Sequence, residues 1–171
     1  NTMSLGLLIA YGPFRYYTGG DVSGRVLDAS GEDIGIEEKI ARLCGAVDIC
    51  KANHHGYLDA MTEGFVREIQ ASAYILPVWD YYHINDVTMA RMASQDLYPG
   101  ERKIFATDIQ EAVLKDFANA SWMKTLAPES GHIVGKVANH GKEYWIYVLS
   151  DENENMIVKA KYGPYIPKKI K

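Results

Sequence analysis

The stretch DICKANHHG, residues 48–56, indicates the fold class and marks the place where we expect chemistry. An apolar run ends here in two adjacent histidines and a glycine, although the whole chain holds only five histidines. The residues before the histidines are typical of a short buried strand. In open α/β sheets, ligands gather at the carboxyl ends of such strands. We therefore expect a strand that carries His54 and His55 to the edge of a sheet.

Two β-rich apolar runs precede this strand, at residues 4–12 and 14–20. A Gly-Pro step separates them and predicts a hairpin. Apolar residues occupy both faces of the first run, because Leu8 and Ala10 alternate with Leu7 and Ile9. We expect this strand to be buried on both sides.

Two segments around the central strand show the apolar spacing of amphipathic helices, at residues 36–45 and 57–70. The first begins with acidic residues and ends at a glycine, as helices commonly do. The predicted buried stripes are Ile36, Ile40, Leu43 and Cys44 in the first segment and Leu58, Met61, Phe65 and Ile69 in the second. Both helices are expected to cover a sheet.

The rest of the chain continues this alternation and then changes in pattern. Strands are predicted at 73–78 and 103–107, and helices at 85–95 and 108–120. Residues 131–163 then alternate over three strands joined by NHGK and DENEN, which is typical of an antiparallel meander. The order predicts an α/β fold with a mixed sheet.

Composition limits the classes of protein that the chain can be. The 171 residues carry a net charge of −4 and 47% hydrophobic residues, values of a globular protein that is neither disordered nor fibrous. The acidic balance gives no general attraction to nucleic acid or anionic membranes. No apolar run approaches the roughly 20 residues of a membrane-spanning helix. No contact with nucleic acid or membrane is therefore evident, and a nucleic-acid binder is only the third hypothesis, while the compartment stays open.

Two loops carry candidate metal ligands. TGGD, residues 18–21, ends one predicted strand, and HHG, residues 54–56, ends the next. A carboxylate from one loop and an imidazole from the other are ligands that zinc accepts, and the glycines let the two backbones approach closely. The alternative is that Asp21 is an ordinary turn residue and that the His-Gly step caps the following helix. The two motifs together favour a metal site.

LPVWDYYHIND, residues 76–86, offers a weaker candidate. Aromatic side chains and His83 follow a predicted strand and could form a wall on the substrate side of the same site. The favoured interpretation is a helix cap with Trp79 and Tyr82 in the core, because large aromatic residues are mostly buried.

The paired motifs TGGD and DICKANHHG resemble the C-terminal half of metallo-β-lactamase-fold hydrolases, particularly the branch similar to the DNA-internalisation competence protein. The resemblance covers most of residues 1–107. It implies that Asp21 bridges two zinc ions, that His55 binds one of them, and that His54 is a neighbour of the metal. It also implies hydrolysis by a metal-activated water.

The chain departs from the family pattern in one respect: no histidine precedes His54, so an H-x-H-x-D-H motif is lacking. Asp21 and His55 are only two ligands, whereas a catalytic zinc uses three protein ligands and water. We therefore expect a fragment that binds zinc weakly and is inactive alone. Residues 1–127 would form half of an αββα sandwich, and residues 128–171 a meander packed on it.

The expected partners follow from this fragment. They are the missing N-terminal half of the same fold, or a second copy of the chain that covers the exposed apolar face. The competing hypothesis is a non-catalytic α/β module in which Asp21 and His55 are turn residues and the aromatic loops bind a protein. The substrate and the identity of the metal stay open.

Overall fold

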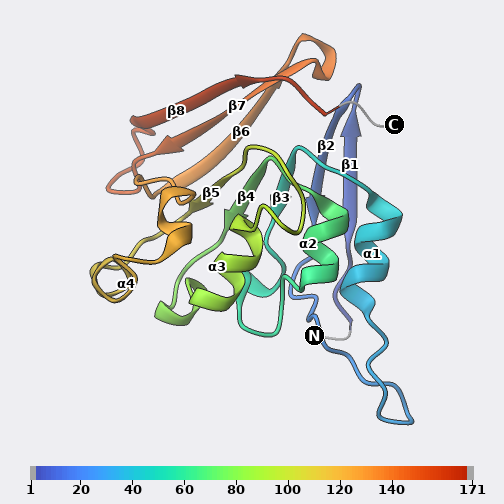
Figure 1. Cartoon of the computed structure of the whole chain (residues 1–171). Helices are drawn as coiled ribbons and strands as arrows, with labels where there is room; N and C mark the ends of the chain where they lie inside the picture. Colours follow the sequence, from blue (N-terminus) through green and yellow to red (C-terminus); the bar gives the residue numbers. More distant parts are fainter. Residues whose placement is uncertain (1–2, 169–171) are drawn as a thin grey trace.

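The computed structural model describes residues 3–168 and contains two β-sheets (Figure 1). The larger sheet has five strands in the order β1-β2-β3-β4-β5. They are β1 (Leu7–Tyr11), β2 (Phe14–Thr18), β3 (Ile49–Lys51), β4 (Ala73–Leu76) and β5 (Lys103–Ala106). β1 pairs antiparallel with β2, and the other neighbours are parallel. The prediction of an α/β fold with a mixed sheet is confirmed.

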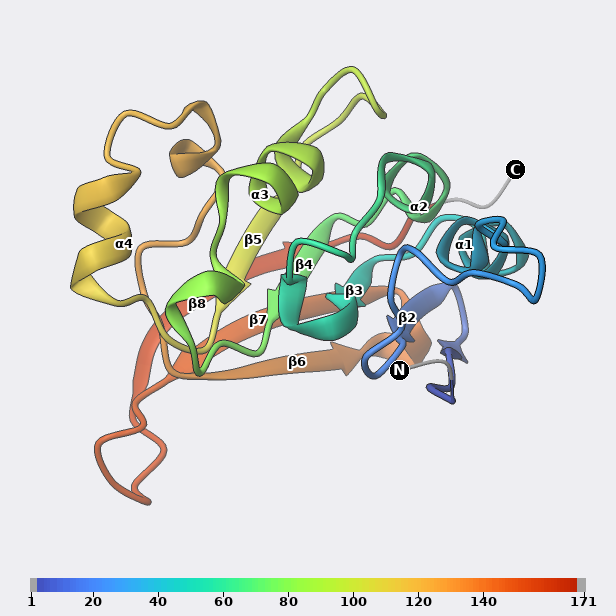
Figure 2. The same ribbon diagram turned by 90° about the horizontal axis from the view of Figure 1, so that it is seen from below.

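Helices follow β2, β3, β4 and β5 along the chain, as the alternation of patterns predicted. They are α1 (Ile36–Cys44), α2 (Glu63–Ile69), α3 (Asp86–Ala93) and α4 (Glu111–Asp116). Short 3₁₀ turns follow several strands and helices: η1 (Asn53–Gly56), η2 (Tyr81–His83), η3 (Ser121–Lys124) and η4 (Asn139–Gly141). α1, α2 and α3 lie side by side on one face of the five-stranded sheet (Figures 1 and 2). No helix in residues 3–168 is long and apolar enough to cross a membrane.

The second sheet is the predicted antiparallel meander, in the order β6-β7-β8. Its strands are β6 (His132–Ala138), β7 (Glu143–Leu149) and β8 (Val158–Tyr165). The meander lies against the face of the larger sheet that the helices leave free (Figure 2). The side chains buried between the two sheets include Phe14, Ile49 and Phe105 from the larger sheet and Tyr144, Ile146 and Val148 from β7. The layers are therefore helix, sheet and sheet.

β3 shows how the pleat divides the core. Ile49 is buried against the meander, whereas Cys50, the next residue, is buried among the helices. Successive side chains of a strand point to opposite faces, so a strand between two layers must be apolar at both positions. This explains the continuous apolar run in the DICKA segment.

The prediction that the first strand is buried on both sides is wrong. β1 is the edge of the sheet and all five of its residues are exposed. Leu7, Ile9 and Tyr11 each expose about half of their surface, at 54%, 53% and 52%. An apolar edge strand with unpaired backbone N–H and C=O groups is a site where another strand or another protein can pair.

Two predicted helix faces need correction. In α1, Ile40 and Cys44 of the predicted stripe pack half-buried against the core, but Leu43 is 88% exposed, and the fully buried residues are Glu37 and Ala41. α2 begins after Thr62, whose hydroxyl accepts a hydrogen bond from the Phe65 N–H at 3.3 Å. Because this cap starts the helix late, Leu58 lies in a turn and is 51% exposed. Met61, Phe65 and Ile69 are fully buried, as predicted.

Candidate metal centre

The loops that follow β2 and β3 meet at one edge of the sheet. The two strands are parallel neighbours, with Tyr17 opposite Cys50, so their carboxyl ends lie side by side. The His54 N–H donates to the Gly20 carbonyl at 3.0 Å, and the Lys51 ammonium donates to the same carbonyl at 3.0 Å. These bonds fix the loop that carries Asp21 against the loop that carries the two histidines.

Gly19 makes this close approach possible. A Cβ atom at this position would lie 2.1 Å from the Asn53 Oδ1 atom and 2.3 Å from the Tyr17 hydroxyl oxygen. Both distances are far below contact distance, so no other residue fits without moving the neighbouring groups. The first glycine of the TGGD motif, Gly19, is therefore required for steric reasons.

The turn that carries the histidines has an unusual backbone. His54 and His55 both have positive φ angles, 42° and 57°, which L-residues with a Cβ adopt rarely. Each such residue costs on the order of 1 kcal/mol or more, and strain of this kind clusters at functional sites. The surrounding hydrogen bonds hold the two imidazoles in directions that a regular helix or strand would not give.

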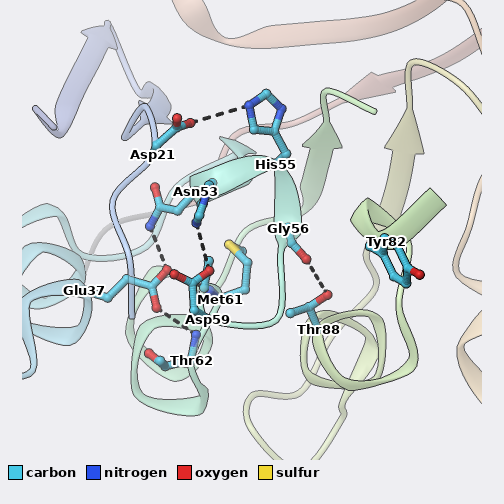
Figure 3. A network of polar contacts seen from close by, with 12 residues as sticks. Asp21, Glu37, Asn53, His55, Gly56, Asp59, Met61, Thr62, Tyr82 and Thr88 are labelled. Carbon is cyan, nitrogen blue, oxygen red and sulfur yellow. Dashed lines mark hydrogen bonds and ion pairs between the residues drawn. The ribbon is translucent and has the colours of Figure 1, made fainter. Parts of the chain in front are cut away.

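His55 is held by its Nδ1 atom, which lies 2.8 Å from the Pro77 carbonyl oxygen. A carbonyl only accepts, so Nδ1 carries the proton. The Nε2 atom then presents its lone pair, and it faces the Asp21 Oδ1 atom at 3.5 Å (Figure 3). Ligating histidines characteristically donate their second ring N–H to a carbonyl or carboxylate in this way.

The 3.5 Å separation between the His55 Nε2 and Asp21 Oδ1 atoms is compatible with two arrangements. A neutral Nε2 and a carboxylate oxygen are both acceptors and cannot bond to each other. A proton on Nε2 would leave a contact of 3.5 Å, longer than an N–H···O hydrogen bond. Zinc distances near 2.0–2.1 Å with a tetrahedral angle place two ligand atoms about 3.4 Å apart. The separation therefore suits two ligands of one divalent metal, and it equally suits an ion pair between Asp21 and a protonated His55.

No third candidate ligand joins Asp21 and His55 in the described part of the chain. Within residues 3–168, no group of three or more histidine, cysteine, aspartate or glutamate side chains is arranged to hold a metal ion. Lys51 is a competing positive charge beside the pair. Burial lowers the pKa of Lys51, and the nearby Asp21 carboxylate opposes that shift. The described part of the chain thus contains no complete metal site.

His54 is directed to a different partner. Its Nδ1 atom lies 2.8 Å from the Asp59 Oδ1 atom, and its ring lies 5.6 Å from the Tyr57 ring. The adjacent histidines therefore point to different carboxylates, His55 to Asp21 and His54 to Asp59. The structure brings Asp21 and His55 together and places His54 beside them in a separate pair.

His83, the weaker candidate from the sequence, lies next to His55. Its ring stacks on the His55 ring at 4.8 Å, with 15° between the planes. His83 is only 4% exposed, and its Nδ1 atom accepts a hydrogen bond from the Trp79 N–H at 3.3 Å. Burial lowers the pKa of His83, and the neighbouring His55 adds to the effect. His83 thus packs, as a neutral side chain, against one face of the His55 ring.

The aromatic residues of this loop are not in the core, contrary to the prediction. Trp79 is 72% exposed and Tyr82 is 59% exposed. Asp80 does cap the turn that follows, since its side chain accepts from the Tyr82 N–H at 2.9 Å. Trp79 meets the His83 ring edge to face at 5.1 Å. An exposed aromatic rim therefore borders the His55–Asp21 pair.

The buried carboxylate of Glu37 holds the loop that carries the two histidines. Glu37 is completely buried, and its oxygens accept hydrogen bonds from Asn53 Nδ2 at 2.8 Å and from the Met61 and Thr62 N–H groups at 2.7 and 2.8 Å (Figure 3). Tyr17 donates to Asn53 Oδ1 at 3.1 Å. Burial raises the pKa of Glu37, and these hydrogen bonds oppose the shift. Sequence reasoning missed this residue, because an acid in the first turn of a helix is normally solvent-exposed.

The far end of the turn is anchored to α3. The Gly56 carbonyl accepts from the Thr88 hydroxyl at 2.8 Å (Figure 3). It also accepts from Asn85 Nδ2 at 2.9 Å. Asn85 also caps α3, since its Oδ1 atom accepts from the Thr88 N–H. The histidine turn is therefore tied at both ends, to α1 through Glu37 and to α3 through Gly56.

Comparison with known proteins adds no family to this description. No protein-family model matches the chain, and no curated protein matches it significantly.

Proposed function

We propose that this chain contributes two ligands, Asp21 and His55, to the metal centre of a hydrolase of the metallo-β-lactamase type. The observation that carries the proposal is the orientation of His55: Nδ1 is bonded to the Pro77 carbonyl, and Nε2 faces the Asp21 carboxylate at 3.5 Å. An unprotonated Nε2 in this position would be available to share a cation with the Asp21 carboxylate. The order of TGGD and HHG along the chain supports the same assignment.

Each residue of the centre has a definite task in this proposal. The Pro77 carbonyl fixes the tautomer of His55 and the direction of its ring. The Asp21 carboxylate has a second oxygen with which it can bridge to a neighbouring ion. A bound zinc would lower the pKa of a coordinated water and polarise the scissile bond. His83, which is buried and stacked on His55, prevents the ring from tilting away.

The remaining ligands would come from a polypeptide segment outside residues 3–168. The exposed apolar residues of β1 support this, because an edge strand with Leu7 and Ile9 half exposed is suited to packing against further protein. The segment would be the N-terminal half of the same fold, or a second copy of this chain in its absence. The complete centre would hold two ions, and the chain alone would bind one ion weakly and would not catalyse.

Calorimetric titration with zinc tests the proposal. It is carried out on the chain alone and on the chain joined to the sequence that precedes it in its gene. We expect weak binding by the first and tight binding by the second. Asp21→Ala and His55→Ala should each abolish tight binding, whereas His132→Ala, an exposed histidine of the meander, should leave it unchanged. Equal affinity in all variants would refute the proposal.

A non-catalytic interaction module is the second candidate. The observation in its favour is that residues 3–168 form no group of three potential metal ligands, while β1 presents an apolar edge. In this case Asp21 and His55 stabilise the loop, and the edge strand binds a protein. A longer polypeptide that still does not bind zinc would support this candidate.

A further inference from the structure

The outer face of the meander carries a surface that the metal centre does not use. The inward side chains of β7 are Tyr144, Ile146 and Val148, which are buried against the larger sheet. The alternate residues Trp145 and Tyr147 therefore point outward and are partly exposed. In residues 3–168 no helix or strand lies over this face (Figures 1 and 2). Two neighbouring aromatic rings thus stand on an open sheet.

Lysines surround these two rings. Lys136 on β6 lies directly opposite Trp145, and Lys161 on β8 lies directly opposite Tyr147. The Lys161 Nζ atom is 5.7 Å from the centroid of the Trp145 ring and 5.7 Å from that of Tyr147. Lys136, Lys159 and Lys161 are all exposed. Positive charge and aromatic surface therefore occur together on three adjacent strands.

Acidic residues lie only at the two ends of this face. Glu143, opposite Ala138, closes one end, and the loop between β7 and β8 carries Asp151, Glu152 and Glu154 at the other. The central registers, from Lys136–Trp145 to Tyr147–Lys161, contain no acid. The net charge of −4 conceals this local basic surface, because the acids are distributed elsewhere.

We propose that the outer face of β6–β8 binds single-stranded nucleic acid. Flat bases stack on exposed aromatic rings, and lysines around the rings neutralise the phosphates that connect the bases. Side chains two residues apart on one strand are separated by about 7 Å, so Trp145 and Tyr147 offer places for two successive bases. The bases of a duplex are already stacked on each other, so a single strand fits this surface better.

The test is titration of the whole chain with fluorescently labelled oligothymidylate at low salt, followed by fluorescence anisotropy. We expect Trp145→Ala to weaken binding at least about 5-fold, the lower end for loss of one stacked base. Trp145→Phe, which keeps a ring and preserves the fold, should retain most of the affinity. Lys136→Ala combined with Lys161→Ala should reduce the salt slope by about 1.4, or about 0.7 for each lost phosphate contact. Lys39→Ala, at an exposed position of α1, is the matched control and should change neither quantity.

Tryptophan fluorescence identifies the place of contact. Trp122 is buried, so in a Trp79→Phe background Trp145 is the tryptophan that a ligand can reach. We expect oligothymidylate to quench its emission, whereas polyglutamate and duplex DNA of equal charge should not. Three results would overturn the proposal: absence of binding at low salt, binding that Trp145→Ala leaves unchanged, or equal binding of polyglutamate, which would indicate a surface for acidic proteins.

Discussion

Replacement of Glu37 by alanine should destabilise the protein strongly, because this buried carboxylate satisfies three donors at once. The Asn53 side chain and the N–H groups of Met61 and Thr62 would lose their acceptor. A buried donor without a partner costs about 1–3 kcal/mol, so three of them should lower the free energy of unfolding by at least about 3 kcal/mol. For a chain of this size, that corresponds to a decrease in Tm of roughly 6–12 °C.

Glu37→Gln separates hydrogen bonding from charge. The glutamine oxygen can still accept two of the bonds, but its amide group faces a donor, so we expect a smaller loss of about 1–3 kcal/mol. Burial raises the pKa of Glu37 above 4.5, so the native state binds this proton more tightly than the unfolded state. Stability should therefore decrease as pH rises from about 4.5 through the raised pKa, and this decrease should be absent from Glu37→Gln.

Urea denaturation followed by circular dichroism, at several pH values between 4 and 8, measures both effects. The zinc affinity of the longer polypeptide provides a second readout, since a loosened turn should no longer direct His55 at Asp21. A Glu37→Ala protein within about 0.5 kcal/mol of the wild type would refute the reasoning, because it would mean that water satisfies the three donors at little cost.

Three further predictions concern the glycine contact, the buried histidine and the open edge. Gly19→Ala should destabilise by about 1–3 kcal/mol in urea denaturation, because its Cβ would lie 2.1 Å from Asn53 Oδ1, whereas Gly20→Asn, at a left-handed position where a Cβ meets only Ser4 at an ordinary 3.7 Å, should cost less than about 1 kcal/mol. The lowered pKa of His83 means that the unfolded state takes up a proton first, so stability should be lost as pH falls below about 6.5; His83→Phe should flatten this part of the pH profile. Leu7→Lys with Ile9→Lys should make the chain monomeric in light scattering without lowering Tm, because both side chains are on an exposed edge strand; a wild type that is monomeric at high concentration would contradict self-association.

The order of elements was predictable because each segment carries a clear local pattern. The apolar DICKA run, the helical spacing of Met61, Phe65 and Ile69, and the alternation in the meander each correspond to an element of the structure. The exposure of β1 was not predictable from its own residues. Apolar residues on both faces fit a central strand, and only the tertiary position places this strand at an edge.

The proximity of Asp21 to His55 also followed from sequence, since each ends one of two consecutive parallel strands. The stacking of His83 on His55 and the burial of Glu37 did not, because both depend on how loops fold back over the sheet edge. The basic aromatic face was equally hidden. Lys136, Trp145 and Lys161 are brought together by strand register and are far apart in the sequence.

Nuclear magnetic resonance of the imidazole nitrogens during a zinc titration tests the central claim most directly. We predict that the nitrogen spectrum of His55 shows a protonated Nδ1 and an unprotonated Nε2, and that Nε2 shifts on addition of zinc. The exposed His132 and His140 serve as internal references, and Asp21→Asn should weaken the response. A proton on Nε2 of His55, or a zinc response that is no greater than that of His132 and His140, would contradict the assignment of Asp21 and His55 as metal ligands.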